Sequence, residues 1–220
     1  MNEIALLSLL HLLGLVYWLG ADLGVFYSSF ILCDARKSAE VRVSAARILF
    51  ALDQAPRISM TLMLPLGVHL ASVMGYITAP AWLVPAVWLL GLSWLAMVLA
   101  LHFLGHGRDL RLLTVFDFWF RATLIAVLLG VAALSIAGQL PAVSSWAGWK
   151  LAVFAGLVCC GLLVRIRLKP FGPAFARLAG GAHGPEDDAA ISASIGGSRP
   201  FVLLIWLGLL VNSALGVHLV

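Results

Sequence analysis

Residues 6–26 read LLSLLHLLGLVYWLGADLGVF, a nearly unbroken apolar run that still contains His11 and Asp22. The run is long enough for a helix to cross the hydrocarbon core of a bilayer, which takes about 20 apolar residues. It exceeds the apolar core of a signal peptide, about 7 to 15 residues, and it has neither a basic flank nor a small-residue cleavage site. We therefore expect a retained membrane-spanning helix whose imidazole and carboxylate have a function.

The rest of the chain has the same character. Of its 220 residues, 62% are hydrophobic and only 11% are charged, and its mean hydropathy is +1.05, whereas soluble domains are about 45–50% apolar. This composition predicts an all-α integral membrane protein with a single transmembrane domain over residues 1–220 and with membrane lipid around it. There is no basic stripe or recognition motif, so nucleic acid is not expected as a partner.

Windows of about 20 apolar residues predict six spans. They cover residues 4–30, 58–78, 81–104, 112–137, 147–168 and 200–219. Of the fourteen Lys and Arg residues, all but Arg121 and Lys150 lie in or beside alternate loops: Arg36, Lys37, Arg42, Arg47 and Arg57; Arg108 and Arg111; Arg165, Arg167, Lys169, Arg177 and Arg199. The positive-inside rule places these loops in the cytoplasm. We therefore expect a six-helix bundle in a bacterial inner (plasma) membrane, with both termini periplasmic.

Two of the expected cytoplasmic connections are long. Residues 34–57 contain an amphipathic pattern, whose apolar positions share one helical face. Those positions are Val41, Ala45, Ile48, Leu49 and Leu52. We expect this connection to lie along the membrane surface. Residues 169–199 are rich in Gly and Ala, and we expect a flexible loop there.

Ionisable side chains within a span are costly, so each is a candidate for function. At about 1.5 Å per residue, His11 and His69 lie at nearly the same depth in the outer half, and Lys150 lies nearer the surface. Two imidazoles at equal depth on facing helices suit haem b, which takes one ligand on each face. Gly14 and Gly67 would let the helices approach the ring. Lys150 would then meet a propionate or another tetrapyrrole carboxylate.

The alternative is that each histidine hydrogen-bonds a neighbouring helix. Asn212 and His218 also belong to the outer half, and His218 is an alternative ligand. In the inner half, His102 is a second alternative ligand. It stands four residues before His106, a spacing that permits a shared metal, although the lack of a third ligand nearby favours an interfacial role.

Three further charged residues lie in the inner half. Asp117 and Arg121 are four residues apart, so they can pair on one helical face and lower each other's cost of burial. Asp22 follows His11 by three turns on a stripe that passes through Trp18, so it also faces the bundle. It is expected either to pair with Arg121 or to pass protons.

The segment LHLLGLVYWLGADLGVFY resembles the first span of the HemJ-type protoporphyrinogen oxidases and of the related CopD copper-resistance membrane domain, in which a histidine precedes a Trp-x-Gly motif. Here these residues are His11, Trp18 and Gly20. PRISMTLMLPLGVHL resembles the second span of these families, and SSWAGWKLAVFAGLV resembles a segment with a membrane-embedded lysine, here Lys150. The last span, with Asn212, is vaguely similar.

The resemblance implies that His11 binds haem and that Lys150 is an essential partner, with Trp18 and Asn212 beside the cofactor. HemJ-like proteins have four spans, so the spans over 81–104 and 112–137 would be an insertion.

We therefore expect a haem b binding redox protein. As an oxidoreductase, it would use Lys150 and Asp22 on a porphyrinogen-like substrate and pass electrons to quinone or to a respiratory partner. The alternatives are a membrane cytochrome subunit for a partner dehydrogenase and a CopD-like copper or small-solute permease without haem. The residues do not decide whether copies of the chain form a homo-oligomer.

Overall fold

The computed structural model describes residues 2–104 and 110–219. Within these ranges the chain forms eight helices and no strand, and the only β-type pairing is the isolated bridge between Ile77 and Val143. The helices are α1 (Glu3–Cys33), α2 (Ala39–Leu52), α3 (Gln54–Val73), α4 (Leu83–Phe103), α5 (Arg111–Ile136), α6 (Ser145–Arg167), α7 (Phe171–Ala179) and α8 (Pro185–Gly216). The expected all-α architecture is confirmed.

Five of the described helices are long and apolar enough to cross a membrane: α1, α4, α5, α6 and α8. The chain is therefore a multi-pass membrane protein. The remaining expected span corresponds to α3, whose 20 residues would cover about 30 Å. Polar residues such as Thr61 and His69 interrupt α3, and it is not among the five. A six-span topology therefore stays a prediction.

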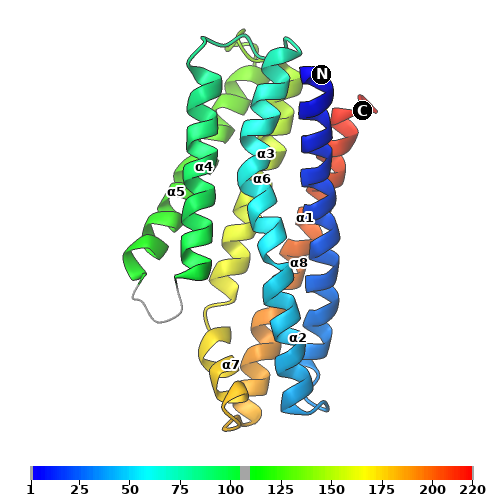
Figure 1. Cartoon of the computed structure of the whole chain (residues 1–220), viewed down its shortest axis with the longest axis vertical. Coiled ribbons are helices and arrows are strands. Elements are labelled where there is room, and N and C mark those ends of the chain that lie inside the picture. The colour runs from blue at the N-terminus through cyan, green and yellow to red at the C-terminus, as the bar shows by residue number, and fades with distance from the viewer. Residues whose placement is uncertain (1, 105–109, 220) are drawn as a thin grey trace.

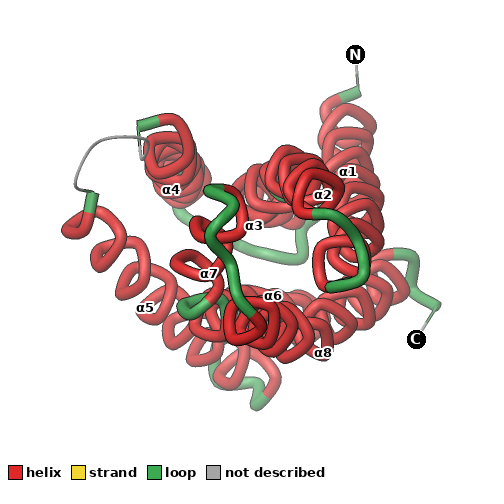
Figure 2. The backbone as a smooth tube through the Cα atoms, turned by 90° about the horizontal axis from the view of Figure 1, so that it is seen from below, coloured by secondary structure: helices red, strands yellow, loops and turns green. Residues whose placement is uncertain are grey.

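The long helices form two layers of three. Figure 2 shows α1, α3 and α4 in one layer and α5, α6 and α8 in the other. Within the layers, α1 packs on α3, α3 on α4, α5 on α6 and α6 on α8. The layers meet at one edge, where α1 contacts α8, while α4 and α5 touch only slightly at the other edge. Both termini lie at the same end of the bundle (Figure 1).

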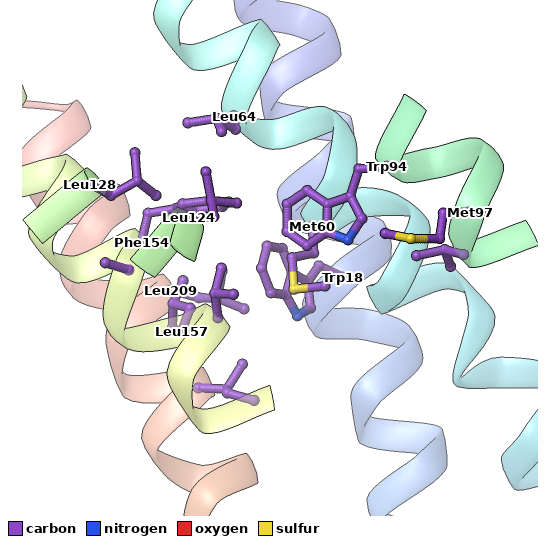
Figure 3. Packing of buried hydrophobic residues seen from close by; sticks show 14 residues of the cluster. Trp18, Met60, Leu64, Trp94, Met97, Leu124, Leu128, Phe154, Leu157 and Leu209 are labelled. Carbon is purple, nitrogen blue, oxygen red and sulfur yellow. The ribbon is translucent and has the colours of Figure 1, made fainter. Parts of the chain in front are cut away.

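An aromatic and aliphatic core joins the two layers at mid-height. Trp94 is 1% exposed and Trp18 is 3% exposed, and the ring of Trp18 meets Phe154 edge-on with 6.5 Å between the centroids. Figure 3 shows both tryptophan rings close to Met60. This core cluster also includes Leu64, Met97, Val98, Leu124, Leu128, Ala155, Leu157, Val158, Ile205 and Leu209.

The expectation of a flexible loop over residues 169–199 is wrong, because most of this stretch is helical. Helix α7 places Phe171, Ala174 and Leu178 on one buried face, and Gly181 then turns the chain with φ = +74°. Helix α8 begins at Pro185, with acidic residues in its first turn, where they favour a helix N-terminus. The glycines between the helices separate two ordered elements and do not mark a disordered segment.

The expectation that the 34–57 connection lies along the membrane surface stays a prediction, and the connection is largely helical. Its helix, α2, packs lengthwise on the end of α1 and contacts α7 (Figure 1). The side chain of Arg42 is 1% exposed; its Nε donates to the Leu32 carbonyl at 2.9 Å and its Nη1 to Asp188 at 2.6 Å. Val41 and Ile48, expected on the apolar face, are exposed. Ala45 and Leu49 of that face are buried beside Arg42, so the buried face of α2 is only rotated relative to the expected one.

Candidate functional site

A cavity of about 340 Å³ lies between the two layers, in the half of the bundle that holds the chain termini. We call it the His11 cavity. Its walls come from α1, α3, α6 and α8, and most of the lining residues are apolar, with Trp18, Leu64 and Phe154 of the core cluster among them. Its polar lining residues are Ser8, His11, Trp146, Lys150, Asn212, Ser213 and His218. Five of the residues expected at the site, His11, Trp18, Lys150, Asn212 and His218, therefore line one cavity.

His11 enters the cavity from the second and third turns of α1. Its ring lies against α3 at Gly67, where a Cβ atom would come within 3.2 Å of the imidazole Cε1. The glycine therefore makes room for the ring. The Nδ1 atom of His11 is buried and has no hydrogen-bond partner among the described residues. Since a buried polar atom is costly without a partner, this imidazole is one of the lining groups that need a ligand.

Lys150 reaches across the cavity from α6 to α8. Its Nζ donates to the main-chain oxygen of Asn212 at 2.8 Å and lies 5.1 Å from the ring centroid of Trp146. An ammonium carries three donors, and this contact uses one of them. The lysine is therefore placed to pair with an anionic group inside an otherwise apolar cavity. The Oδ1 of Asn212 is buried without a partner in the described part of the chain.

An aromatic group closes the cavity at the end of the bundle. The rings of Trp146 and His218 stack with 5.1 Å between their centroids, and the Tyr76 hydroxyl lies 3.2 Å from Nε2 of His218. The indole nitrogen of Trp146 donates to the Leu215 carbonyl at 2.7 Å. These contacts place His218, an expected alternative ligand, at the mouth of the cavity and not beside the core.

The structure does not bring His69 into this cavity. Its Nδ1 accepts from the indole nitrogen of Trp88 at 3.3 Å, and its Nε2 lies 3.3 Å from a carboxylate oxygen of Glu3. Both ring nitrogens thus have partners outside the cavity, and the expected facing pair with His11 is not formed. The alternative from the sequence, a histidine that bonds neighbouring helices, describes His69.

Two other expected site residues are also placed elsewhere. Gly14 does not line the cavity; a Cβ atom there would lie 2.7 Å from Sδ of Met63, so this glycine makes room for the methionine. Asp22 is 7% exposed and lines neither cavity. It lies one turn beyond Trp18 on the inner side of α1.

The charged residues of the other half gather around a second cavity, of about 450 Å³, which we call the Asp117 cavity. The expected pair is present: Nε of Arg121 lies 3.0 Å from Asp117. His102 lines this cavity, whereas His106 and Arg108 lie outside the described residues. Within the described ranges, no group of three or more His, Cys, Asp or Glu residues is arranged to hold a metal ion on its own.

Sequence reasoning missed several lining residues. Met63 of α3, Met74 at the end of α3 and Ile77 beyond the glycine turn all line the cavity, and Tyr76 contacts the lining residues Trp146 and His218. The aromatic residues beside the predicted ends of the spans could have indicated where the mouth of the His11 cavity lies, because Trp and Tyr gather at membrane interfaces. Nothing in the spacing of the methionines distinguished lining from packing positions.

Comparison with known proteins adds no assignment. No family model matches the chain, and no curated protein and no solved structure matches it significantly.

Proposed function

We propose that the chain is a membrane-embedded haem b protein with a redox function and that the His11 cavity holds the tetrapyrrole. The proposal depends chiefly on one observation: the imidazole of His11, with an unpartnered buried nitrogen, shares an apolar cavity with the ammonium of Lys150. A tetrapyrrole with acidic side chains combines these requirements, because it offers a metal to the imidazole, a flat apolar body and carboxylates.

The lining of the cavity suits such a group. Its 340 Å³ lies at the lower end of the roughly 300–1,000 Å³ of small-molecule sites, so a tetrapyrrole would extend beyond the cavity. Trp18 and Phe154 supply flat apolar surface at its base. His11 would ligate iron and Lys150 would pair with a propionate, and His218 is the only other described histidine that lines the cavity. Because His69 does not line the cavity, one histidine ligand, His11, is favoured over a pair of facing histidine ligands.

Bound haem b would supply one-electron exchange. The residues of the chain would hold the cofactor and adjust its redox potential. The imidazole of His11 would hold the iron and influence its potential, the ammonium of Lys150 would pair with a carboxylate, and the aromatic walls would keep water away. In an oxidoreductase of the protoporphyrinogen-oxidising kind, the electrons would pass to quinone or to a respiratory partner. In a cytochrome subunit they would come from a partner dehydrogenase.

Histidine variants test the proposal. We expect His11→Ala to lose most of its haem, because the cavity then keeps only the imidazole of His218, at its mouth. We expect His69→Ala to keep its haem. Haem is measured in purified protein by the reduced-minus-oxidised visible spectrum and by the ratio of haem to protein. His183→Ala, outside the bundle, is the matched control. Wild-type protein without haem, or His11→Ala with full haem, would refute the assignment.

A copper permease related to CopD is the second candidate, and a specific observation favours it. Met63 and Met74 line the same cavity as His11, while Met60 lies in the core. Thioethers and imidazole are ligands that suit Cu(I). Under this proposal the purified protein binds copper and no haem, and Met63→Leu lowers its copper content. Metal analysis beside the visible spectrum separates the two functions.

A further inference from the structure

The Asp117 cavity carries more positive than negative charge. Its lining includes three arginines, Arg57, Arg121 and Arg165, but only two carboxylates, Asp53 and Asp117. Arg57 pairs with Asp53 at 2.5 Å, and both Arg121 and Arg165 contact Asp117, whose side chain is 0% exposed. One carboxylate thus serves two guanidiniums, and one positive charge stays without a counter-ion among the described lining residues.

The arginines also have more donors than the cavity has acceptors. Each guanidinium carries five N–H donors, so two carboxylates cannot accept from all the donors of three guanidiniums. Nη1 of Arg121 finds only the weak acceptor Sδ of Met60, at 4.0 Å, and the guanidinium lies 5.3 Å from the ring centroid of Trp94. Uncompensated charge at this depth is costly, which favours an anion in the cavity.

The cavity lies at the ends of three membrane-compatible helices, α4, α5 and α6, where the phosphate groups of a bilayer are expected. It is bordered by the first turn of α3, the last turn of α4, the first turns of α5 and the last turn of α6, at the end of the bundle that holds most of the basic residues. Helices α4 and α5, which both line it, separate toward this end (Figure 1). Basic pockets between spans on this side of a membrane bind the head groups of anionic lipids.

We propose that the Asp117 cavity is a binding site for a phosphate group, which an anionic phospholipid supplies from the adjacent leaflet. Guanidinium suits this ligand because its planar fork matches two phosphate oxygens. Arg57 and Arg165 are the direct contacts, since their side chains are 49% and 35% exposed while lining the cavity. Arg121 is buried and shares the single carboxylate of Asp117 with Arg165, so this group of three carries a net positive charge. The site is independent of the function proposed for the His11 cavity.

Lipid binding by the full chain tests this site. Delipidated protein in neutral detergent is titrated with phosphatidylglycerol or with phosphatidylcholine, and bound lipid is counted by native mass spectrometry. We expect wild-type protein to bind phosphatidylglycerol in preference to phosphatidylcholine. Arg57→Gln and Arg165→Gln should each weaken phosphatidylglycerol binding roughly fivefold, which corresponds to about 1 kcal/mol per basic residue. Arg57→Lys and Arg165→Lys should lose less, because they keep the charge.

Arg36→Gln is the matched control. It removes the same charge near the same end of the bundle, but Arg36 is 91% exposed, pairs with Asp34 and does not line the cavity. Added inorganic phosphate distinguishes the sources: displacement of the lipid by phosphate shows a site for the phosphate group alone, and persistence of the lipid shows a lipid site. Equal binding of the two lipids by wild type, or equal losses in Arg36→Gln and Arg165→Gln, would overturn the proposal. The wild-type comparison and the lysine variants keep it testable if a glutamine variant fails to fold.

Discussion

Lys150 has a structural partner as well as a proposed ligand, and the two contributions can be separated. Its Nζ donates to the Asn212 carbonyl in the last turns of α8, where the helix dipole favours a cation. Gly216 leaves space for this ammonium, since a Cβ atom there would lie 3.0 Å from Nζ. A lysine that only caps α8 could be replaced by another donor. A lysine that also pairs with a carboxylate could not.

We therefore expect Lys150→Gln to weaken binding of an acidic tetrapyrrole about 10-fold or more, since a hydrogen bond to a charged group contributes roughly 1.5–3 kcal/mol. Lys150→Arg keeps the charge but changes its reach, so it should be impaired and partly functional. Haem titration of the purified variants and the redox potential of the bound haem measure both effects. Lys37→Gln, at the other end of the bundle, is the control. If Lys150→Gln matches wild type in both measurements, the residue only caps α8.

The same scale shows what the sequence could and could not predict about the site. The depth of a residue in the membrane could be predicted: His11 and Lys150, chosen for their positions along predicted spans, line one cavity. The rotation of each helix about its own axis could not be predicted. Residues two apart on a helix point about 200° apart, so once Gly67 faces His11, His69 must face away, toward Trp88. Which side of α3 faces α1 depends on packing along the whole helix, and a single polar residue does not reveal it.

At the scale of elements, the contact between α3 and α4 depends on a glycine. A Cβ atom at Gly91 would lie 2.6 Å from Cγ of Pro65 and 3.1 Å from the main-chain oxygen of Thr61. The proline ring is rigid and the oxygen belongs to a helix backbone, so neither neighbour can move cheaply. Close approach of two membrane helices at a small residue is a common means of association in lipid.

Gly91→Ala should therefore destabilise the protein by about 1–3 kcal/mol, the usual cost of overpacking. Gly130→Ala is the matched control, because a Cβ atom there has no neighbour within 4 Å, and it should be neutral or slightly stabilising, since Ala favours a helix. Unfolding in mixed micelles, followed by circular dichroism, measures both. Equal stability of the two variants would show that α3 and α4 do not pack this closely.

The elements also show why part of the fold escaped sequence reasoning. The long apolar runs predicted five helices that the structure confirms to be long and apolar enough to cross a membrane. The apolar positions of α7, Phe171, Ala174 and Leu178, have helical spacing over only 9 residues, and the neighbouring glycines obscured it. This helix is stabilised by a second apolar cluster shared with α1, α2 and α8, which includes Leu32, Ala46 and Ile191. Contacts between segments so far apart in the chain are not visible in a local pattern.

At the scale of the whole molecule, the two cavities lie in opposite halves of the bundle and the core cluster borders both. Of this cluster, Trp18, Leu64 and Phe154 line the His11 cavity, and Val98 lines the Asp117 cavity. A ligand in one half is thus separated from the other half by packed apolar side chains. The half with His11 and Lys150 holds both chain termini, and the other half holds most of the basic residues. The orientation of the chain therefore decides which side of the membrane each cavity faces.

The charge distribution predicts that orientation. Helices α1 and α8 start and end the chain at the same end of the bundle (Figure 1), as an even number of crossings requires, and the positive-inside rule assigns this end to the outside. A reporter fused to the C-terminus that is active only in the periplasm should therefore be active, and a reporter inserted after Arg36 should not. Since α3 is the least apolar of the long helices, a third fusion after Gly75 tests whether it crosses the membrane. An active fusion at Gly75 would support six crossings. A cytoplasmic C-terminus would instead leave five crossings, with α3 held inside the bundle.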